Sequence, residues 1–184
     1  MAVKEKQTAP GFSLSELLAA LAIVGILASM SLGSFSALIA ESRISSNVSN
    51  LVHILHLARQ TSWSTGQDVV LCNSSTGSQC ENGRNWEAGW LLFSNLDKDD
   101  PPQADPGEPI HRTSGALANM TVLANRRAFI MRPFGRRSTN GTLIYCDKRG
   151  APGARAIIVS YTGKARQSRQ QANGSNINCP AARP

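Results

Sequence analysis

Residues 11–28 read GFSLSELLAALAIVGILA, and this segment sets the architecture of the chain. It opens an apolar run that continues to about Leu32 and contains one charged residue, Glu16. About 20 residues cross a hydrocarbon core of ~30 Å, whereas the apolar part of a cleavable secretory signal has about 7–15 residues and an A-x-A-like exit. The run is longer than such a signal and has no such exit. It therefore predicts one transmembrane helix.

Glu16 is the unusual residue of this helix. A carboxylate inside a spanning helix is energetically costly and usually marks a functional site with a positively charged partner. A second interpretation places Glu16 in the first helical turn at interface depth, where the helix dipole favours a negative charge.

The segment resembles the class III signal and N-terminal helix of type IV pilins and type II secretion pseudopilins. The shared features are a short basic leader, Gly11, Phe12 and a Glu at the fifth position of the mature chain. The resemblance implies that a membrane-bound prepilin peptidase removes the leader, residues 1–11, by cutting between Gly11 and Phe12. The same enzyme would methylate the new amine of Phe12, and Glu16 would neutralise the terminal amine of a neighbouring subunit during assembly.

Three positions depart from the usual pilin pattern. Ser13 and Ser15 replace the usual Thr and Ile, and Gly33 stands where many pilins carry a Pro that interrupts the helix. Glycine also weakens a helix, so Gly33, like the usual Pro, permits local melting of the helix in a filament.

An amphipathic helix follows the apolar segment. Its apolar residues recur at spacings of three and four, and they are Ile44, Val48, Leu51, Val52, Leu55 and Ala58. This period predicts that the helix continues to about Trp63 and is ended by Thr65-Gly66. The whole N-terminal helix then consists of a transmembrane or filament-core half, residues 12–38, and an amphipathic half, residues 39–64. The apolar stripe of the amphipathic half needs a partner.

Residues 65–184 are predicted to form a β-rich domain, which the resemblance to pilins places in the periplasm. Short β-branched and aromatic segments alternate there with clusters of Gly, Pro, Asn and Asp. The predicted strands are Val69–Cys72, Trp90–Phe93, Met120–Ala124, Ala128–Met131, Thr142–Asp147 and Ala156–Tyr161. The acidic segment Asp97–Glu108 is predicted to be a loop. An antiparallel sheet packed on the amphipathic helix gives an α+β, type IV pilin-like fold with one long N-terminal helix.

Two further features narrow the resemblance. Trp86-Glu87-Ala88-Gly89-Trp90-Leu91-Leu92-Phe93 is similar to the W-x-x-G-W-x-x-F signature of the GspH/FimT/FimU group of minor pilins and pseudopilins. Four later segments occur in the order of that group: Phe134–Arg136, Gly141–Cys146, Arg155–Ser160 and Thr162–Arg166. The aromatic residues of the signature are also expected to be core residues.

Four cysteines in a chain whose bulk lies beyond a membrane helix are typical of an oxidising compartment. Cys72 and Cys80 enclose a loop rich in Ser and Gly, and Cys146 and Cys179 could tie the C-terminal tail to the sheet. These are the preferred pairs, although four cysteines allow three connectivities. A zinc site is the alternative, but no C-x-x-C pair or neighbouring His is present.

No catalytic or metal site is predicted. His53 and His56 lie three residues apart on the helix and are expected to face solvent. The acidic loop lacks the EF-hand spacing and its Gly, which favours a solvated loop over a calcium site. Neither a G-x-S-x-G nor a phosphate-loop pattern occurs.

Positive charge is concentrated in the C-terminal part of the chain. Residues 1–111 contain 6 basic and 11 acidic residues, whereas residues 112–184 contain 13 basic residues and a single acidic one, Asp147. Eleven of those 13 are arginine, which favours bidentate contacts with phosphate. Such asymmetry suggests an anionic partner. The alternative is a solvated surface, or one that pairs with acidic residues of neighbouring subunits.

A short motif favours DNA as that partner. Gly163-Lys164-Ala165-Arg166 resembles the G-R-x-R motif through which the FimT-like branch of the group binds DNA in natural transformation, with Lys in place of the first Arg. We predict that seven residues contact DNA phosphates without sequence preference: Arg136, Arg137, Arg149, Arg155, Lys164, Arg166 and Arg169.

The sequence thus predicts a non-enzymatic minor pilin of a type IV pilus system that binds DNA for natural transformation. The alternatives are a FimU-like structural minor pilin that primes or caps pilus assembly, and a GspH-like pseudopilin of type II secretion. The resemblance implies a single-pass protein of the bacterial inner membrane, with a periplasmic C-terminal domain, that enters a pilus filament or its tip. The implied partners are the prepilin peptidase, other major and minor pilins, the inner membrane and DNA, and no cofactor is predicted.

Overall fold

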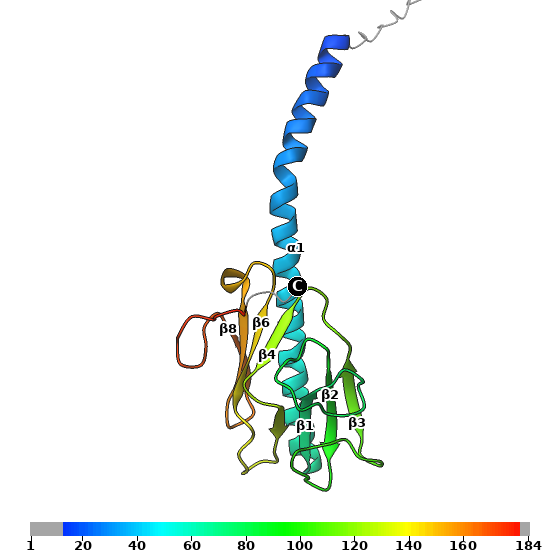
Figure 1. Cartoon of the computed structure of the whole chain (residues 1–184), viewed down its shortest axis with the longest axis vertical. Helices are drawn as coiled ribbons and strands as arrows, with labels where there is room; N and C mark the ends of the chain where they lie inside the picture. The colour runs from blue at the N-terminus through cyan, green and yellow to red at the C-terminus, as the bar shows by residue number, and fades with distance from the viewer. Residues whose placement is uncertain (1–12, 181–184) are drawn as a thin grey trace, which may run out of the picture. The chain divides into compact units, whose positions relative to one another are not determined.

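A computed structural model describes residues 13–180, with side chains throughout that range except at residues 26–34. The predicted cleavage site between Gly11 and Phe12 lies outside the described residues. The described residues form a long helix, α1 (Leu14–Thr65), followed by short strands (Figure 1). Two compact units divide the chain between Ala40 and Glu41, so α1 contributes to both.

In the first unit, α1 begins with a reciprocal cap. The Ser13 hydroxyl accepts a hydrogen bond from the Glu16 backbone N–H at 3.3 Å, and the Ser13 backbone N–H donates to the Glu16 carboxylate at 2.9 Å. This S-x-x-E arrangement is a capping box, which satisfies two backbone donors of the first turn. The described part of the chain contains no helix whose length and apolar character suit a membrane span. The assignment of residues 12–38 to the membrane stays a prediction.

In the second unit, the apolar stripe of α1 is buried. Ile44, Val48, Leu51, Leu55 and Ala58 are each at most 1% exposed, and they belong to one core that also contains residues of both sheets. The helix ends at Thr65, because Gly66 takes the left-handed conformation with φ of 73° and donates its N–H to the Ser62 carbonyl at 3.0 Å.

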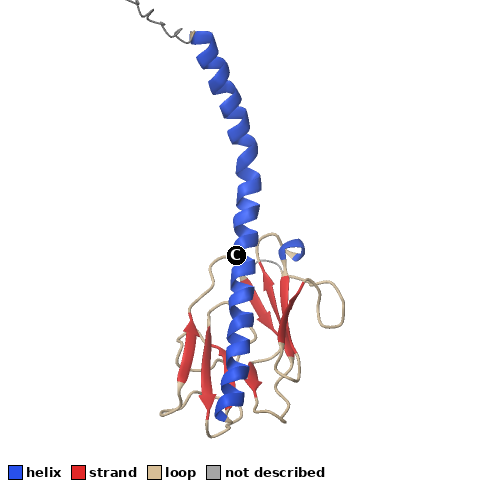
Figure 2. Ribbon diagram, turned by 180° about the vertical axis from the view of Figure 1, so that it is seen from behind, coloured by secondary structure: helices blue, strands red, loops and turns tan. Residues whose placement is uncertain are grey.

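The strands form two antiparallel sheets, which both pack against α1 (Figure 2). The first has the order β3-β2-β1-β5 and consists of β1 (Asp68–Asn73), β2 (Trp90–Asn95), β3 (Ile110–Ser114) and β5 (Ala128–Met131). The second has the order β4-β6-β7-β8 and consists of β4 (Thr121–Ala124), β6 (Gly141–Cys146), β7 (Arg155–Val159) and β8 (Ala165–Ser168). A short 3-10 helix, η1 (Ala151–Gly153), precedes β7. The predicted α+β, pilin-like fold is confirmed.

Two details of the sequence prediction were wrong. A single sheet was expected, whereas β4 and β5, which are adjacent in the chain, belong to different sheets. Strands β3 and β8 were not predicted, because IHRTS and ARQS lack an apolar run. Both are edge strands, which have one hydrogen-bonded neighbour and can therefore be largely polar.

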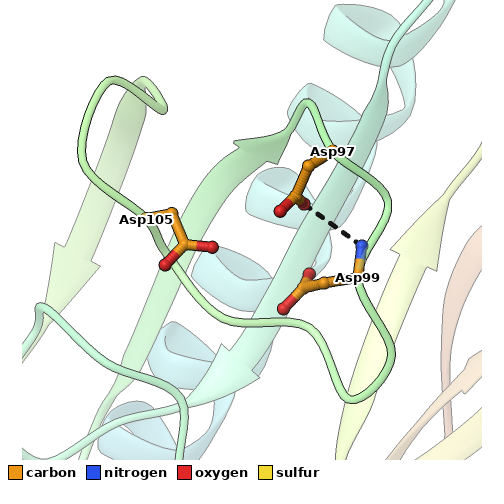
Figure 3. A group of neighbouring side chains, drawn as sticks. All are labelled: Asp97, Asp99 and Asp105. Atoms are coloured by element: carbon orange, nitrogen blue, oxygen red, sulfur yellow. Dashed lines mark hydrogen bonds between the residues drawn. The ribbon is translucent and has the colours of Figure 1, made fainter.

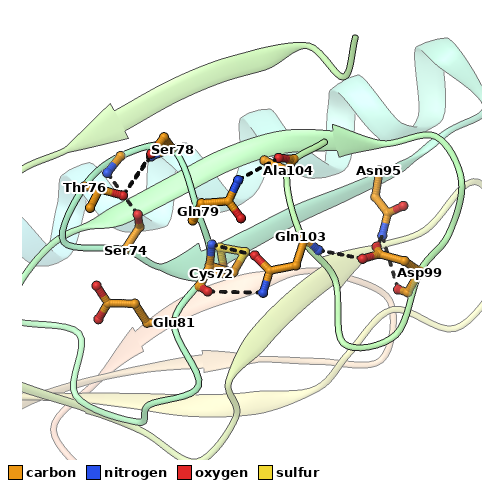
Figure 4. The surroundings of a disulfide bond; sticks show 12 residues. Cys72, Ser74, Thr76, Ser78, Gln79, Glu81, Asn95, Asp99, Gln103 and Ala104 are labelled. Atoms are coloured by element: carbon orange, nitrogen blue, oxygen red, sulfur yellow. Dashed lines mark hydrogen bonds between the residues drawn. A yellow bond between two sulfur atoms is a disulfide. The ribbon is translucent and has the colours of Figure 1, made fainter. Parts of the chain in front are cut away.

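Two disulfides hold segments onto the outer faces of the sheets. Cys72 is joined to Cys80 and Cys146 to Cys179, so none of the four cysteines is free. Around the first bond, Gln103 accepts from the Cys80 N–H at 3.1 Å and donates to the Cys80 carbonyl at 3.2 Å (Figure 4). The second bond attaches the tail, and Ile177 packs with Cys146 and Ala156.

Candidate functional site

Two of the seven predicted DNA-binding residues surround Glu41 of α1. Arg149 donates to the Glu41 carboxylate at 2.8 Å and to Asp147 at 2.7 Å, and Arg155 also donates to Glu41. The Arg149 hydrogen bond, with the charges of Arg155 and Arg169, holds the pKa of Glu41 below its ordinary value, against an opposing effect of burial. The Arg155 side chain is only 9% exposed. Both guanidinium groups are therefore engaged within the chain.

Arg136 is engaged in a similar way with a buried carboxylate at the start of β1. It donates to Asp68 at 2.8 Å, and Arg132 approaches the other Asp68 oxygen at 3.4 Å. The Asp68 side chain is 6% exposed, whereas that of Arg136 is 49% exposed. Arg136 thus supplies the cationic partner that the buried Asp68 carboxylate requires, while half of its own side chain stays exposed.

The remaining four predicted residues, Arg137, Lys164, Arg166 and Arg169, are exposed. Among residues 13–180, none of them forms a salt bridge. Lys164 lies in the turn between β7 and β8, and Arg166 lies on β8 opposite Ile158. Arg137 contacts this same turn, because its guanidinium lies 5.5 Å from the Tyr161 ring.

The acidic loop brings three carboxylates together outside the basic region. Oxygen atoms of Asp97, Asp99 and Asp105 lie within 4.8 Å of one another (Figure 3). Asp97 accepts from the Asp99 N–H at 3.1 Å, and Asp99 accepts from the Asn95 amide and the Gln103 N–H, each at 2.9 Å. Burial, and the charge of Asp97, raise the pKa of Asp99 against the hydrogen bonds it accepts. Asp97 and Asp99 thus hold the loop backbone through the hydrogen bonds that they accept.

The sequence did not predict a group of exposed aromatic residues. Trp63, Phe134 and Tyr161 are 43%, 84% and 54% exposed, and they come from α1, from the segment after β5 and from the β7–β8 turn. Their signal in the sequence was weak, because each is a single aromatic residue next to a predicted element boundary. The acidic partners Glu41 and Asp68 were missed as well, since they lie 114 and 68 residues from Arg155 and Arg136.

Comparisons with known proteins define the class. Residues 8–32 match the prokaryotic N-terminal methylation motif. Two crystal forms of the type IV minor pilin FimU from Pseudomonas aeruginosa PAO1 share the fold, with a TM-score of 0.51 for each. Their sequence identities are 14% and 15%, and the matches cover 67% of this chain and 91% and 87% of those chains. The molecule therefore has the pilin-like fold, and proteins of this pseudopilin type are structural proteins and not enzymes.

A family match is more specific. Residues 47–163 match the family described as type II transport protein GspH. The chain belongs to this family. No curated protein matched the chain. The methylation motif implies processing by a prepilin peptidase and residence in the inner membrane, and the family implies association with other pilins.

Proposed function

We propose that the chain is a structural minor subunit that primes or caps a filament of the type IV pilus or type II secretion class. The exposed apolar surface of α1 carries this proposal. Leu14, Leu17, Leu18, Leu21, Ile23 and Val24 are all between 55% and 77% exposed. Side chains of this kind need an apolar environment, which membrane lipid supplies before assembly and neighbouring pilin helices supply afterwards.

Glu16 is the single charged residue between residues 13 and 40. In a bundle of apolar helices its carboxylate needs a positive partner, because an unpaired charge in such surroundings is strongly unfavourable. The amine of Phe12, exposed by cleavage after Gly11, provides one on a neighbouring subunit. In this proposal the capping box holds Glu16 in the single subunit, and assembly adds the second partner.

The test separates the role of Glu16 in the helix capping box from its role in filament assembly. Glu16→Ala should leave membrane insertion and cleavage intact but greatly reduce recovery of the chain in sheared filaments, measured by immunoblotting. Ser13→Ala is the matched control, since it removes the hydroxyl of the cap and keeps the carboxylate. Equal incorporation of Glu16→Ala and the parent would contradict the proposal. A deletion strain should form fewer filaments of ordinary length if the subunit primes assembly.

A second candidate function is non-specific DNA binding for natural transformation. It is supported by four exposed basic residues that form no salt bridge in the described part of the chain, Arg137, Lys164, Arg166 and Arg169. In this proposal they contact phosphates, whereas Arg149, Arg155 and Arg136 hold the surface in place through Glu41 and Asp68. If roughly four phosphates are neutralised, log affinity should fall with log salt with a slope of about −3.6.

The corresponding variant is Lys164→Gln with Arg166→Gln, which should weaken DNA binding and transformation together. Arg112→Gln is the control, because Arg112 is an exposed arginine on β3 of the other sheet. If the double variant binds duplex DNA as the parent does, the basic surface is better assigned to contacts with neighbouring subunits.

A further inference from the structure

Three exposed aromatic rings and three cations lie on α1 near its C-terminal end and on two segments held against it, the segment after β5 and the β7–β8 turn. We call this the aromatic–cationic surface, and it consists of Arg59, Trp63, Phe134, Arg137, Tyr161 and Lys164. The Trp63 and Phe134 rings meet edge to face, with 5.7 Å between their centroids. The Arg59 guanidinium lies 3.8 Å from the Trp63 ring centroid. These rings stand at the surface and not in the core.

The segments that carry this surface are held together firmly. Arg59 donates to the Thr162 carbonyl at 2.8 Å, and the Ser138 N–H donates to the Tyr161 carbonyl at 2.9 Å. Gly163 lies so close to Met131, Ser138 and Arg59 that an added Cβ would stand 3.0–3.3 Å from their side chains. The helix, the segment after β5 and the β7–β8 turn therefore present their side chains in a fixed arrangement.

The charge of the surface has one sign. Arg59, Arg137 and Lys164 form no salt bridge within residues 13–180. The nearby acidic residue Asp68 is buried and already pairs with Arg132 and Arg136. A ligand that covers this surface should therefore offer negative charge to the cations and flat apolar faces to the rings.

We propose that the aromatic–cationic surface binds single-stranded nucleic acid by stacking unpaired bases on Phe134 and Tyr161 while Arg137 and Lys164 contact the phosphates. Single strands combine regularly spaced charge with accessible base faces, which a duplex keeps inside its stack. Phe134 is the main stacking residue because 84% of it is exposed, whereas Arg59 already covers one face of Trp63. This inference rests on the DNA-binding function proposed above and adds a preferred form of the ligand.

The test compares a single strand with a duplex. The full-length chain in detergent is titrated with a dye-labelled oligothymidine of about 16 nucleotides and with a duplex of the same length. Phe134→Ala should weaken binding of the single strand roughly 5- to 150-fold, the range that stacking on one aromatic residue represents, and should leave duplex binding unchanged. Phe134→Tyr should retain the parent affinity, because it keeps the ring.

A control variant and a second readout make the result specific. Ile110→Ala, which removes an exposed apolar side chain from β3 at the opposite edge of the first sheet from β5, should change neither affinity. The oligothymidine should also quench tryptophan emission through Trp63, since Trp86 and Trp90 are buried.

The possible failures are distinguishable. If neither probe binds, the DNA-binding function and this inference fall together. If the duplex binds but Phe134→Ala leaves single-strand affinity unchanged, only this inference is overturned. Reduced filament incorporation of Phe134→Ala with unchanged single-strand affinity would assign the surface to a neighbouring pilin subunit instead.

Discussion

Glu41 shows how single residues connect the helix to the sheets. It lies at the first position of the second unit and binds Arg149 and Arg155, which flank η1. Asp147 completes the network through Arg149. Burial raises the pKa of Asp147, but the hydrogen bonds and charge of Arg149 more than offset this effect, so its pKa is also lowered.

Removal of the Glu41 charge should destabilise the fold in a pH-dependent way. Glu41→Gln should lower the free energy of unfolding by about 1–2 kcal/mol at pH 7, a modest value because the Glu41 side chain is 38% exposed. Since the folded-state pKa of Glu41 is lowered, its stabilising effect is fully present above the unfolded pKa and is lost as pH falls through the folded value.

Urea unfolding of the full-length chain in detergent at a series of pH values checks this expectation. The difference between the parent and Glu41→Gln should be constant from pH 7 to about pH 5 and shrink below about pH 4. Ser42→Ala, at the exposed neighbouring position, is the control. A difference that grows on acidification would contradict the assignment.

The sequence predicted the residue types at these sites better than their roles. The surplus of arginine after residue 111 was visible, but the pairing of Arg155 with Glu41 spans 114 residues and leaves no local pattern. Similarly, Ser13 and Glu16 form a capping box that the S-x-x-E spacing could have indicated, although Glu16 was first interpreted through its expected membrane surroundings.

At the scale of elements, the β7–β8 turn depends on Gly163, the first residue of the Gly-Lys-Ala-Arg motif. Gly163 has φ of 72° and close neighbours, whereas Gly66 has φ of 73° and nothing within 4 Å of an added Cβ. The glycine of the motif is therefore required by backbone conformation and by packing, and the charged residues that follow it depend on that turn.

These two glycines form a matched pair for measurement. Gly66→Ala should lower the free energy of unfolding by about 1 kcal/mol, because an L-residue is strained in the left-handed region. Gly163→Ala should cost roughly 1 kcal/mol more, since the methyl group crowds the buried Met131 side chain. If denaturant unfolding shows equal losses of unfolding free energy for the two variants, the side chains around Gly163 can move to accommodate the methyl group.

The disulfides should differ in their contribution to stability. Cys146–Cys179 closes 33 residues and Cys72–Cys80 closes 8, so the chain-entropy model gives about 3–4 kcal/mol for the first and about 2–3 kcal/mol for the second. Double Cys→Ala variants of each pair, unfolded in denaturant, check the order. If the loss at Cys72–Cys80 is the larger one, burial of Cys72 and not loop closure dominates.

Strands were predictable where they are apolar and buried. The segments of β1, β2 and β5 have apolar and aromatic runs, and each was located within one or two residues. Sheet membership was not predictable, because pairing of β4 with β6 and of β5 with β1 is decided by packing against α1 and not by any local signal.

At the scale of the whole molecule, part of the positive charge that follows residue 111 is paired with carboxylates within the chain. Three of the seven arginine and lysine residues first assigned to DNA hold Glu41, Asp147 and Asp68, and these contacts join α1, β1 and the segments around β7. The exposed remainder lies near β8 and its turn. A count of charges along the sequence cannot make this distinction, because it depends on which carboxylates the fold brings close.

Processing and assembly as a pilin-like subunit require removal of the leader, and intact mass measurement of the protein extracted from membranes detects that removal. We expect a chain that has lost Met1–Gly11 and begins with N-methylated Phe12, and we expect a Gly11→Val variant to keep its leader. A mature protein that still carries Met1–Gly11, with an unmodified N-terminus, would contradict it.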